Sequence, residues 1–401
     1  MTVGPMSRDG ILVLLACMIL TLALGSVHAF SIFLETLEGR FDVSRSEVSL
    51  IYSFSLVCIT IAVLFGHLIF NHLHSVLLVS LIALTSAAGC ALAAQATNLH
   101  MIWLGYSVMF GTANGLGYGF ALQCSAQANP NTKGFSMGCV TATYALGAAL
   151  VPIPFELLLH RGGFTLAMNG LAIAMLIILP FIIYLLLKGK GVLKVPKPTK
   201  KGISPRQRFL VVKLWLGYGT AVAAGLMIMG HATGIAKAGG LDAEEVVYAP
   251  IIIALFNMLG SLLGGWFADQ TTVRQSVMAF PGLSVISLII IIYFGGGVVT
   301  VCGLALIGLA YGATIVAYPA AVATVFGVGA GVRVYGQVFT AWGAAGLIAP
   351  WFAGVLFERT ENYNMALVAA ASVGVVSVLI ACLLPTDRAI ISDGTEQSIK
   401  I

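Results

Sequence analysis

Charged residues are confined to short stretches of this chain, and no other feature constrains its fold as strongly. Asp, Glu, Lys and Arg are absent from long runs such as 48–132 and 275–332, and the uncharged runs divide into twelve apolar segments of spanning length. About 20 apolar residues cross the hydrocarbon core as a helix, because each residue rises ~1.5 Å and the helix satisfies its own backbone polar groups. The sequence therefore predicts an all-α membrane protein with twelve transmembrane helices.

Composition agrees with this prediction. Hydrophobic residues make up 59% of the chain, charged residues make up 9%, and the mean hydropathy is +1.01. Such a chain cannot bury its apolar surface in one soluble core, so the lipid bilayer is its expected partner, and the net charge of +5 does not indicate nucleic-acid binding. The seven cysteines lie in apolar stretches without C-x-x-C spacing, so we expect small core residues and neither a disulfide framework nor a metal site.

Polar residues and glycine-rich turns set the boundaries of the predicted spans. We predict membrane-spanning helices over residues 11–35, 46–70, 75–94, 98–122, 134–158, 164–187, 209–236, 246–268, 275–294, 298–325, 333–357 and 363–384. If the N-terminus is inside, 15 of the 20 Lys and Arg residues lie on the inner side. Because Lys and Arg accumulate in cytoplasmic loops, we predict that both termini are cytoplasmic, and we expect a bacterial inner membrane.

One long hydrophilic stretch divides the predicted helices six and six. It covers residues 188–208, is basic, and contains Pro196, Pro198 and Pro205. We therefore predict an N-terminal six-helix bundle over 1–187, a cytoplasmic linker over 188–208, and a C-terminal six-helix bundle with a short tail over 209–401. Transporters built from repeats have this layout, with a substrate cavity between the halves near the bilayer midplane. The alternative is a bundle of twelve helices without that symmetry.

The loop after the eighth predicted helix carries a recognisable motif. The stretch from Gly264 to Arg274 places an acid, Asp269, at the helix end and a base, Arg274, across the turn. It resembles the G-x-x-x-D-x-x-x-x-R loop of the major facilitator superfamily, in which such a pair can latch neighbouring helices in one state. The alternative is an ordinary capped turn with a surface ion pair worth under about 1 kcal/mol. The corresponding loop after Gly66 has neither acid nor base.

Within that superfamily, the chain resembles the oxalate/formate antiporter and monocarboxylate transporter branch. The stretches that carry this resemblance are residues 41–49, the glycine series Gly111, Gly115, Gly117 and Gly119, the loop 129–134, and residues 308–313, 318–321 and 335–343. The resemblance implies a carrier that works by alternating access on a small organic acid. We also expect the protein to function as a monomer.

The sequence departs from this branch at the positions that bind anions. Carriers of the branch usually place an arginine on helix 8 and some place a lysine on helix 11, because a desolvated carboxylate needs a cation. Here Ser261 and Trp342 stand at those positions, and no Lys or Arg lies near the middle of any predicted span. This departure argues against recognition of a dianion such as oxalate.

The candidate substrate-binding residues are therefore neutral near pH 7. His28 and His231 lie on helices 1 and 7, which are equivalent in the two halves, and an intramembrane histidine could couple the substrate to protons or supply a conditional positive charge. The alternative is that each is a neutral histidine that satisfies a helix contact. The other candidates are hydroxyl, amide and indole side chains on predicted helices 4, 5, 8, 10 and 11: Asn114, Tyr118, Tyr144, Asn257, Ser261, Tyr311, Tyr318 and Trp342. Such groups orient a small solute without a formal charge, although each one alone could serve interhelical contact.

The sequence leaves other functions open. Met227, Met229, His231 and Met258 could bind a soft metal, so a copper importer is one alternative, and a carrier of a neutral solute is another. No nucleophile–base pair, phosphate loop or metal motif points to an enzyme. We expect a secondary active transporter for a small organic acid, most simply a monocarboxylate, with proton-linked transport or exchange and without a cofactor.

Overall fold

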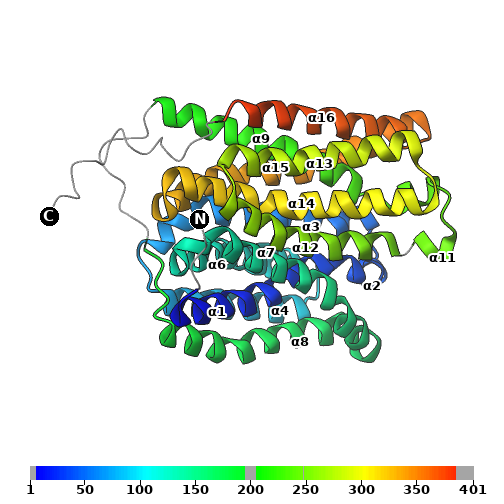
Figure 1. Ribbon diagram of the computed structural model, residues 1–401. Coiled ribbons are helices and arrows are strands. Elements are labelled where there is room, and N and C mark those ends of the chain that lie inside the picture. Colours follow the sequence, from blue (N-terminus) through cyan, green and yellow to red (C-terminus); the bar gives the residue numbers. More distant parts are fainter. Residues whose placement is uncertain (1–5, 195–204, 247, 385–401) are drawn as a thin grey trace, which may run out of the picture. The chain divides into compact units, whose positions relative to one another are not determined.

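The computed structural model describes residues 6–194, 205–246 and 248–384, and every regular element in that part of the chain is a helix (Figure 1). The first half contains α1 (Arg8–Leu24), the 3-10 helix η1 (Gly25–Phe33), α2 (Leu34–Phe41), α3 (Arg45–Phe70), α4 (Ser75–Ala94), α5 (Leu99–Ile102), the π-helix η2 (Trp103–Phe110), α6 (Gly111–Ala128), η3 (Pro130–Thr132), α7 (Lys133–Leu150) and α8 (Pro152–Lys188). The second half contains α9 (Pro205–Met229), α10 (Ala232–Ala238), α11 (Ala243–Val246), α12 (Tyr248–Gln270), α13 (Val273–Phe294), α14 (Gly297–Phe326), α15 (Val328–Thr360) and α16 (Asn364–Cys382).

The prediction of an all-helical membrane protein is confirmed. Ten stretches of the described residues are long and apolar enough to cross a membrane, and one of them, Pro130–Lys188, is 59 residues long. That stretch contains two predicted spans, and its backbone leaves the helical conformation at Gly162 and Gly163. The predicted span 98–122 falls on α5, η2 and α6, which follow one another without a loop. All twelve predicted segments therefore fall on helices.

The described residues form two compact units. One unit contains 6–130 and 143–194, and the other contains 131–142 together with the described residues from 205 onward. The first ten of the 18 residues of α7 thus group with the C-terminal helices, although the sequence predicted that they belong to the N-terminal bundle. Residues 195–204 of the predicted linker, residues 385–401 of the predicted tail and the first five residues lie outside the described residues.

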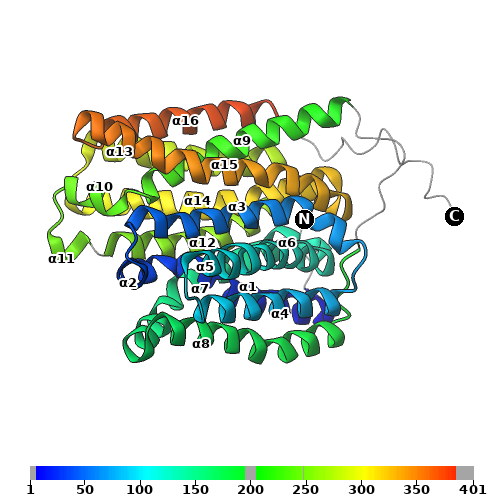
Figure 2. The ribbon, with the colours of Figure 1, turned by 180° about the vertical axis from the view of Figure 1, so that it is seen from behind.

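In the N-terminal unit, α4 packs along α8, α1 lies between α6 and α8, and α3 packs along α6 (Figure 2). Small residues allow the backbones to approach closely, as they do in other membrane helix pairs. A Cβ atom added to Gly89 of α4 would lie 2.5 Å from the carbonyl oxygen of Gly105 in η2. A larger residue at either glycine would force these two segments apart.

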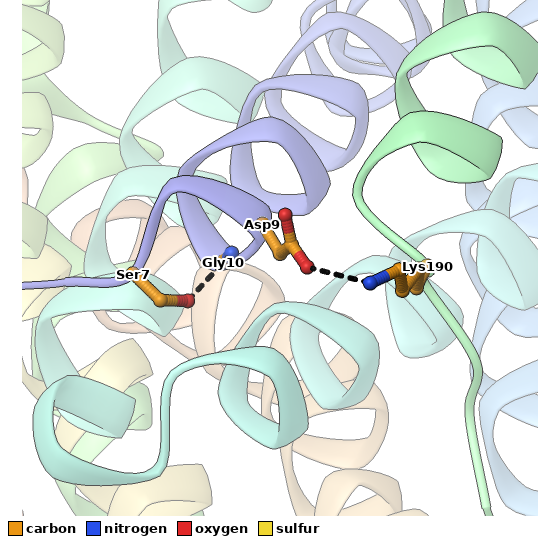
Figure 3. A network of polar contacts seen from close by, with 4 residues as sticks. All are labelled: Ser7, Asp9, Gly10 and Lys190. Carbon is orange, nitrogen blue, oxygen red and sulfur yellow. Dashed lines mark hydrogen bonds and ion pairs between the residues drawn. The ribbon is translucent and has the colours of Figure 1, made fainter.

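The segment after α8 returns to the start of α1 (Figure 3). The Ser7 hydroxyl accepts a hydrogen bond from the Gly10 amide at 3.0 Å and caps α1. Lys190 lies 3.6 Å from the Asp9 carboxylate, and both side chains are at least half exposed. An exposed pair of this kind contributes under about 1 kcal/mol.

In the C-terminal unit, α12 packs along α14, α9 packs along α15 and α16, and α13 packs along α14 and α16. The α12–α14 contact is close: a Cβ atom added to Gly264 would lie 2.5 Å from Cα of Ala313, and one added to Gly308 would lie 2.6 Å from the Ile253 carbonyl oxygen. A buried apolar cluster around Ile228, Leu288 and Ile307 fills one part of this unit.

Candidate functional site

The first transmembrane segment changes from α-helix to 3-10 helix at Gly25, in the region that carries His28. Such a change frees backbone carbonyl groups, and in a membrane a neighbouring helix must satisfy them. The Asn114 side-chain amide donates a hydrogen bond to the Leu24 carbonyl at 2.6 Å, and the Tyr106 hydroxyl donates one to the Val27 carbonyl at 3.0 Å. Polar side chains of the fourth transmembrane segment therefore hold η1 in place.

The fourth segment has its own irregularity, the π-helix η2. π-Helical turns are rare and are often found at functional sites. Within η2, Tyr106 bonds to η1, and the hydroxyl of the next residue, Ser107, donates to the Ile51 carbonyl of α3 at 2.6 Å. This segment thus connects the first and second transmembrane segments through adjacent residues.

A polar aromatic cluster forms around His28. Its ring nitrogen Nδ1 lies 2.7 Å from the Tyr52 hydroxyl, and its ring meets the ring of Tyr144 edge-on at 5.3 Å. The Tyr144 hydroxyl donates to Oδ1 of Asn114 at 2.9 Å, and the rings of Tyr118 and Tyr144 lie 5.0 Å apart. We call these five residues the N-terminal cluster.

Four members of the N-terminal cluster were predicted from the sequence, on three different helices, and the structure brings them together. Tyr52 was not predicted. It is one tyrosine in a long apolar span, and no feature of the sequence separates it from an ordinary lipid-facing or interfacial tyrosine. Tyr52 is identified only in the structure, where η1 turns His28 toward α3.

A second polar aromatic group lies in the C-terminal unit. The indole Nε1 of Trp342 donates to the Tyr311 hydroxyl at 2.9 Å, and the ring of Phe339 stacks on Trp342 with centroids 5.0 Å apart. We call Tyr311, Phe339 and Trp342 the C-terminal cluster. Phe339 was not predicted, although its spacing of three residues from Trp342 places both on one face of α15.

The predicted residues of α12 serve the contact with α14. The Ser261 hydroxyl is fully buried and lies 3.0 Å from the Asn257 carbonyl and 3.3 Å from the Gly312 carbonyl. A Cβ atom added to Gly312 would lie 2.5 Å from the Asn257 side-chain oxygen. Both residues therefore face α14, at a glycine where the two helices approach closely.

Tyr318 and His231 lie apart from the two clusters. Tyr318 is fully buried and packs on the ring of Tyr218 at 4.8 Å, two helical turns from Tyr311. His231 lies in the break between α9 and α10, so the predicted helix 209–236 is interrupted there. Its Nε2 lies 3.0 Å from the Pro350 carbonyl of α15, and a carbonyl only accepts, so this nitrogen carries the proton.

The loop acid Asp269 binds the start of α7. One carboxylate oxygen accepts from the Gly134 amide at 2.8 Å and the other accepts from the Phe135 amide at 2.8 Å. An anion at a helix N-terminus is favoured by the unpaired amides and by the helix dipole. Arg274, the predicted partner of Asp269, donates from Nε to the Leu384 carbonyl at 2.7 Å.

Three of the four residues of the copper alternative have other contacts in the structure. Met227 and Met229 belong to or pack against the apolar cluster of the C-terminal unit, and His231 binds the Pro350 carbonyl. Within the described residues, no group of three or more His, Cys, Asp or Glu side chains is placed to hold a metal ion.

Both clusters consist of uncharged hydrogen-bonding groups and aromatic rings. The segments that carry them, 10–34, 48–132, 134–155, 275–332 and 334–357, contain no Asp, Glu, Lys or Arg. Imidazole, phenol, amide and indole groups can orient a solute by hydrogen bonds and can cover an apolar face of it with a ring. This chemistry suits a small solute that is neutral when bound.

We expect replacement of Trp342 by phenylalanine to lower transport roughly fivefold, because the ring stays and the hydrogen bond to Tyr311, worth about 1 kcal/mol, is lost. Initial uptake rates in proteoliposomes provide the measurement. The matched control is Trp351→Phe on the same helix, where the side chain is 66% exposed and transport should stay within about twofold. Equal uptake rates for Trp342→Phe and Trp351→Phe would show that Trp342 is not part of the site.

The family model of the Major Facilitator Superfamily matches residues 11–350. The chain belongs to this superfamily, and it is an integral membrane transporter with the fold of that family. A curated relative is the uncharacterised MFS-type transporter YhjX of Escherichia coli (strain K12), which is 25% identical over 358 residues, 86% of this chain and 87% of that protein.

Two solved structures confirm the fold at low sequence identity. The proton:xylose symporter XylE is 14% identical, has a TM-score of 0.72, and the match covers 94% of this chain and 96% of that chain. The fucose:proton symporter FucP of E. coli is 16% identical, has a TM-score of 0.67, and the match covers 94% of this chain and 99% of that chain. Neither likeness identifies the substrate.

Proposed function

We propose that the protein is a secondary active transporter that moves a small monocarboxylate together with a proton by alternating access. The observation that carries this proposal is the uncharged composition of the N-terminal and C-terminal clusters. A carboxylate that leaves water without a cation is strongly disfavoured, whereas the same acid with its proton is neutral and can donate and accept hydrogen bonds. Exchange of one such acid for another is an alternative form of this mechanism, and it requires no net movement of protons.

Purified protein in proteoliposomes tests the proposal. Uptake of labelled monocarboxylates is measured with an inward proton gradient, with the gradient collapsed by an ionophore, and with unlabelled acid trapped inside. Acceleration by the gradient supports proton-linked transport, and acceleration by trapped acid supports exchange. Absence of monocarboxylate uptake under all three conditions, in vesicles where correct insertion is verified by protease protection, contradicts the proposed substrate.

A neutral hydroxylated solute is the second candidate. The stacked rings of Phe339 and Trp342, next to the Tyr311 hydroxyl, favour it because they combine a flat apolar surface with hydrogen-bonding groups. Two proteins of the same fold are described as proton symporters of xylose and fucose. The same vesicles distinguish the candidates, since sugar uptake in the absence of monocarboxylate uptake would favour the second.

We also propose that both termini are cytoplasmic and that the membrane is a bacterial inner membrane. In this orientation Asp269 and Arg274 form a conformational latch at the cytoplasmic side. The bias of Lys and Arg supports this orientation. The carboxylate contacts at the start of α7 support a holding role for Asp269, and the bond from Arg274 to the Leu384 carbonyl supports a separate role in tying α13 to the end of α16. Cysteine labelling of position 133 from either side tests the orientation.

A further inference from the structure

The two ring nitrogens of His28 have different roles in hydrogen bonding. In a neutral imidazole one nitrogen donates a hydrogen bond and the other accepts. Nδ1 lies 2.7 Å from the Tyr52 hydroxyl. The groups that face the ring from the neighbouring helices are Tyr52 of α3 and the ring edge of Tyr144 of α7, and neither is charged at neutral pH.

The contacts of Tyr52 decide which partner donates. Among the described residues, Nδ1 of His28 is the one hydrogen-bond partner of the Tyr52 hydroxyl. If Tyr52 donates, its O–H is satisfied and Nδ1 is the acceptor. If Tyr52 accepts, its own O–H is left without a protein partner in an apolar segment, which is unfavourable. The ring of Phe30 is stacked parallel to Tyr52 at 6.3 Å, and this keeps the phenol in the plane from which it reaches His28.

The second ring nitrogen is then a free donor. When Nδ1 accepts, the proton of the neutral ring lies on Nε2. His28 is half-buried, and Nε2 is not among the fully buried side-chain atoms that lack a partner, so this nitrogen retains accessible surface. A donor of this kind, on a ring that contacts Tyr144, suits an oxygen acceptor on a small solute.

We infer that Tyr52 is a positioning residue that holds His28 in its Nε2–H form, and that His28 meets the substrate as a neutral hydrogen-bond donor to an oxygen atom. His28 is then not the group that carries the proton across the membrane; the proton travels on the acid itself. The contact with substrate rests on the proposed function, whereas the state of the ring does not.

Nitrogen NMR of the full-length protein in lipid nanodiscs, labelled with 15N-histidine, tests the state of the ring without any substrate. Protonated and unprotonated ring nitrogens have well-separated shifts, and the His28 signals are those missing from His28→Gln. We expect an unprotonated Nδ1 and a protonated Nε2 at neutral pH, and the appearance of the second form in Tyr52→Phe. A protonated Nδ1 in the unmodified protein would overturn the inference.

The matched control is Tyr106→Phe. It also removes a buried hydroxyl that bonds η1, but its partner is the Val27 carbonyl, so the His28 signals should keep the form seen in the unmodified protein. If both tyrosine variants change the ring equally, the effect comes from disturbance of η1, and the positioning role of Tyr52 is contradicted.

Uptake measurements test the contact with substrate. Glutamine keeps a neutral N–H donor at position 28, and leucine does not. We expect His28→Gln to retain at least about a third of the uptake rate and to keep its dependence on the proton gradient, and His28→Leu to lose roughly tenfold. Loss of the dependence on the proton gradient in His28→Gln would indicate that His28 carries the proton, and it would overturn the inference. If the ring has the expected form but no monocarboxylate is transported, the substrate proposal fails and the positioning role of Tyr52 stands.

Discussion

Alanine at position 269 is expected to reduce transport by about 100-fold or more without preventing insertion into the membrane. Asp269 holds the first turn of α7 through two amide hydrogen bonds, each 2.8 Å long. Hydrogen bonds to a charged group contribute about 1.5–3 kcal/mol each, and the anion also complements the helix dipole.

The asparagine variant separates charge from geometry. Asp269→Asn keeps one acceptor oxygen and loses both the second acceptor and the negative charge, so we expect an intermediate loss of roughly tenfold. The measurements are initial uptake rates, together with the thermal midpoint of the purified protein. The control is Asp9→Asn, which removes the exposed ion pair with Lys190 and should leave uptake within about twofold. Wild-type uptake in Asp269→Ala would contradict the latch.

Leucine at position 114 is the second substitution with a large expected effect. Asn114 is fully buried, donates to the Leu24 carbonyl at the start of η1 and accepts from the Tyr144 hydroxyl. Leucine has nearly the same shape, but it removes both hydrogen bonds, and the loss of a hydrogen bond at a buried site costs about 1–3 kcal/mol. We expect the uptake rate to fall by roughly 30-fold or more, and the thermal midpoint of unfolding to fall with it.

Gln123, nine residues later on α6, provides the matched control for this substitution. It is 2% exposed, and its side-chain oxygen has no hydrogen-bond partner in the described part of the chain. Replacement by leucine of a side chain whose buried amide oxygen is unsatisfied removes a cost instead of creating one, so Gln123→Leu should be neutral or stabilising. A similar loss in both variants would show that α6 rejects leucine generally and that the contacts of Asn114 have no special role.

The sequence was sufficient to predict the helices because the distribution of charge marks them. The twelve predicted apolar spans all coincide with helices, and the motif around Asp269 falls at the end of α12, as expected. The superfamily followed from the same features. The narrower resemblance to carriers of oxalate, formate or monocarboxylates enters only as part of the proposed function.

The candidate site was predicted less well, for reasons that lie in the backbone. Periodicity assumes a regular helix, and it cannot anticipate the 3-10 turn of η1 or the π-turn of η2, which bring Tyr52 and Tyr106 into contact with the first segment. It also could not anticipate the break after Met229, which places His231 against the Pro350 carbonyl. Asn114 and Tyr144 lie on regular helices, and the structure places Tyr144 against His28 and Asn114 against Tyr144, while their role in binding a substrate stays a prediction.

The grouping of residues 131–142 with the C-terminal helices has a practical consequence for work with split chains. A cut in the basic linker yields two fragments with six predicted spans each, but it leaves the second compact unit without the α7 turns that Asp269 and Gly265 contact. The C-terminal fragment is therefore incomplete as an autonomous fold. Co-expression of both fragments should restore a stable protein, whereas the C-terminal fragment alone should be degraded, and complementation would then report directly on the Asp269 contact.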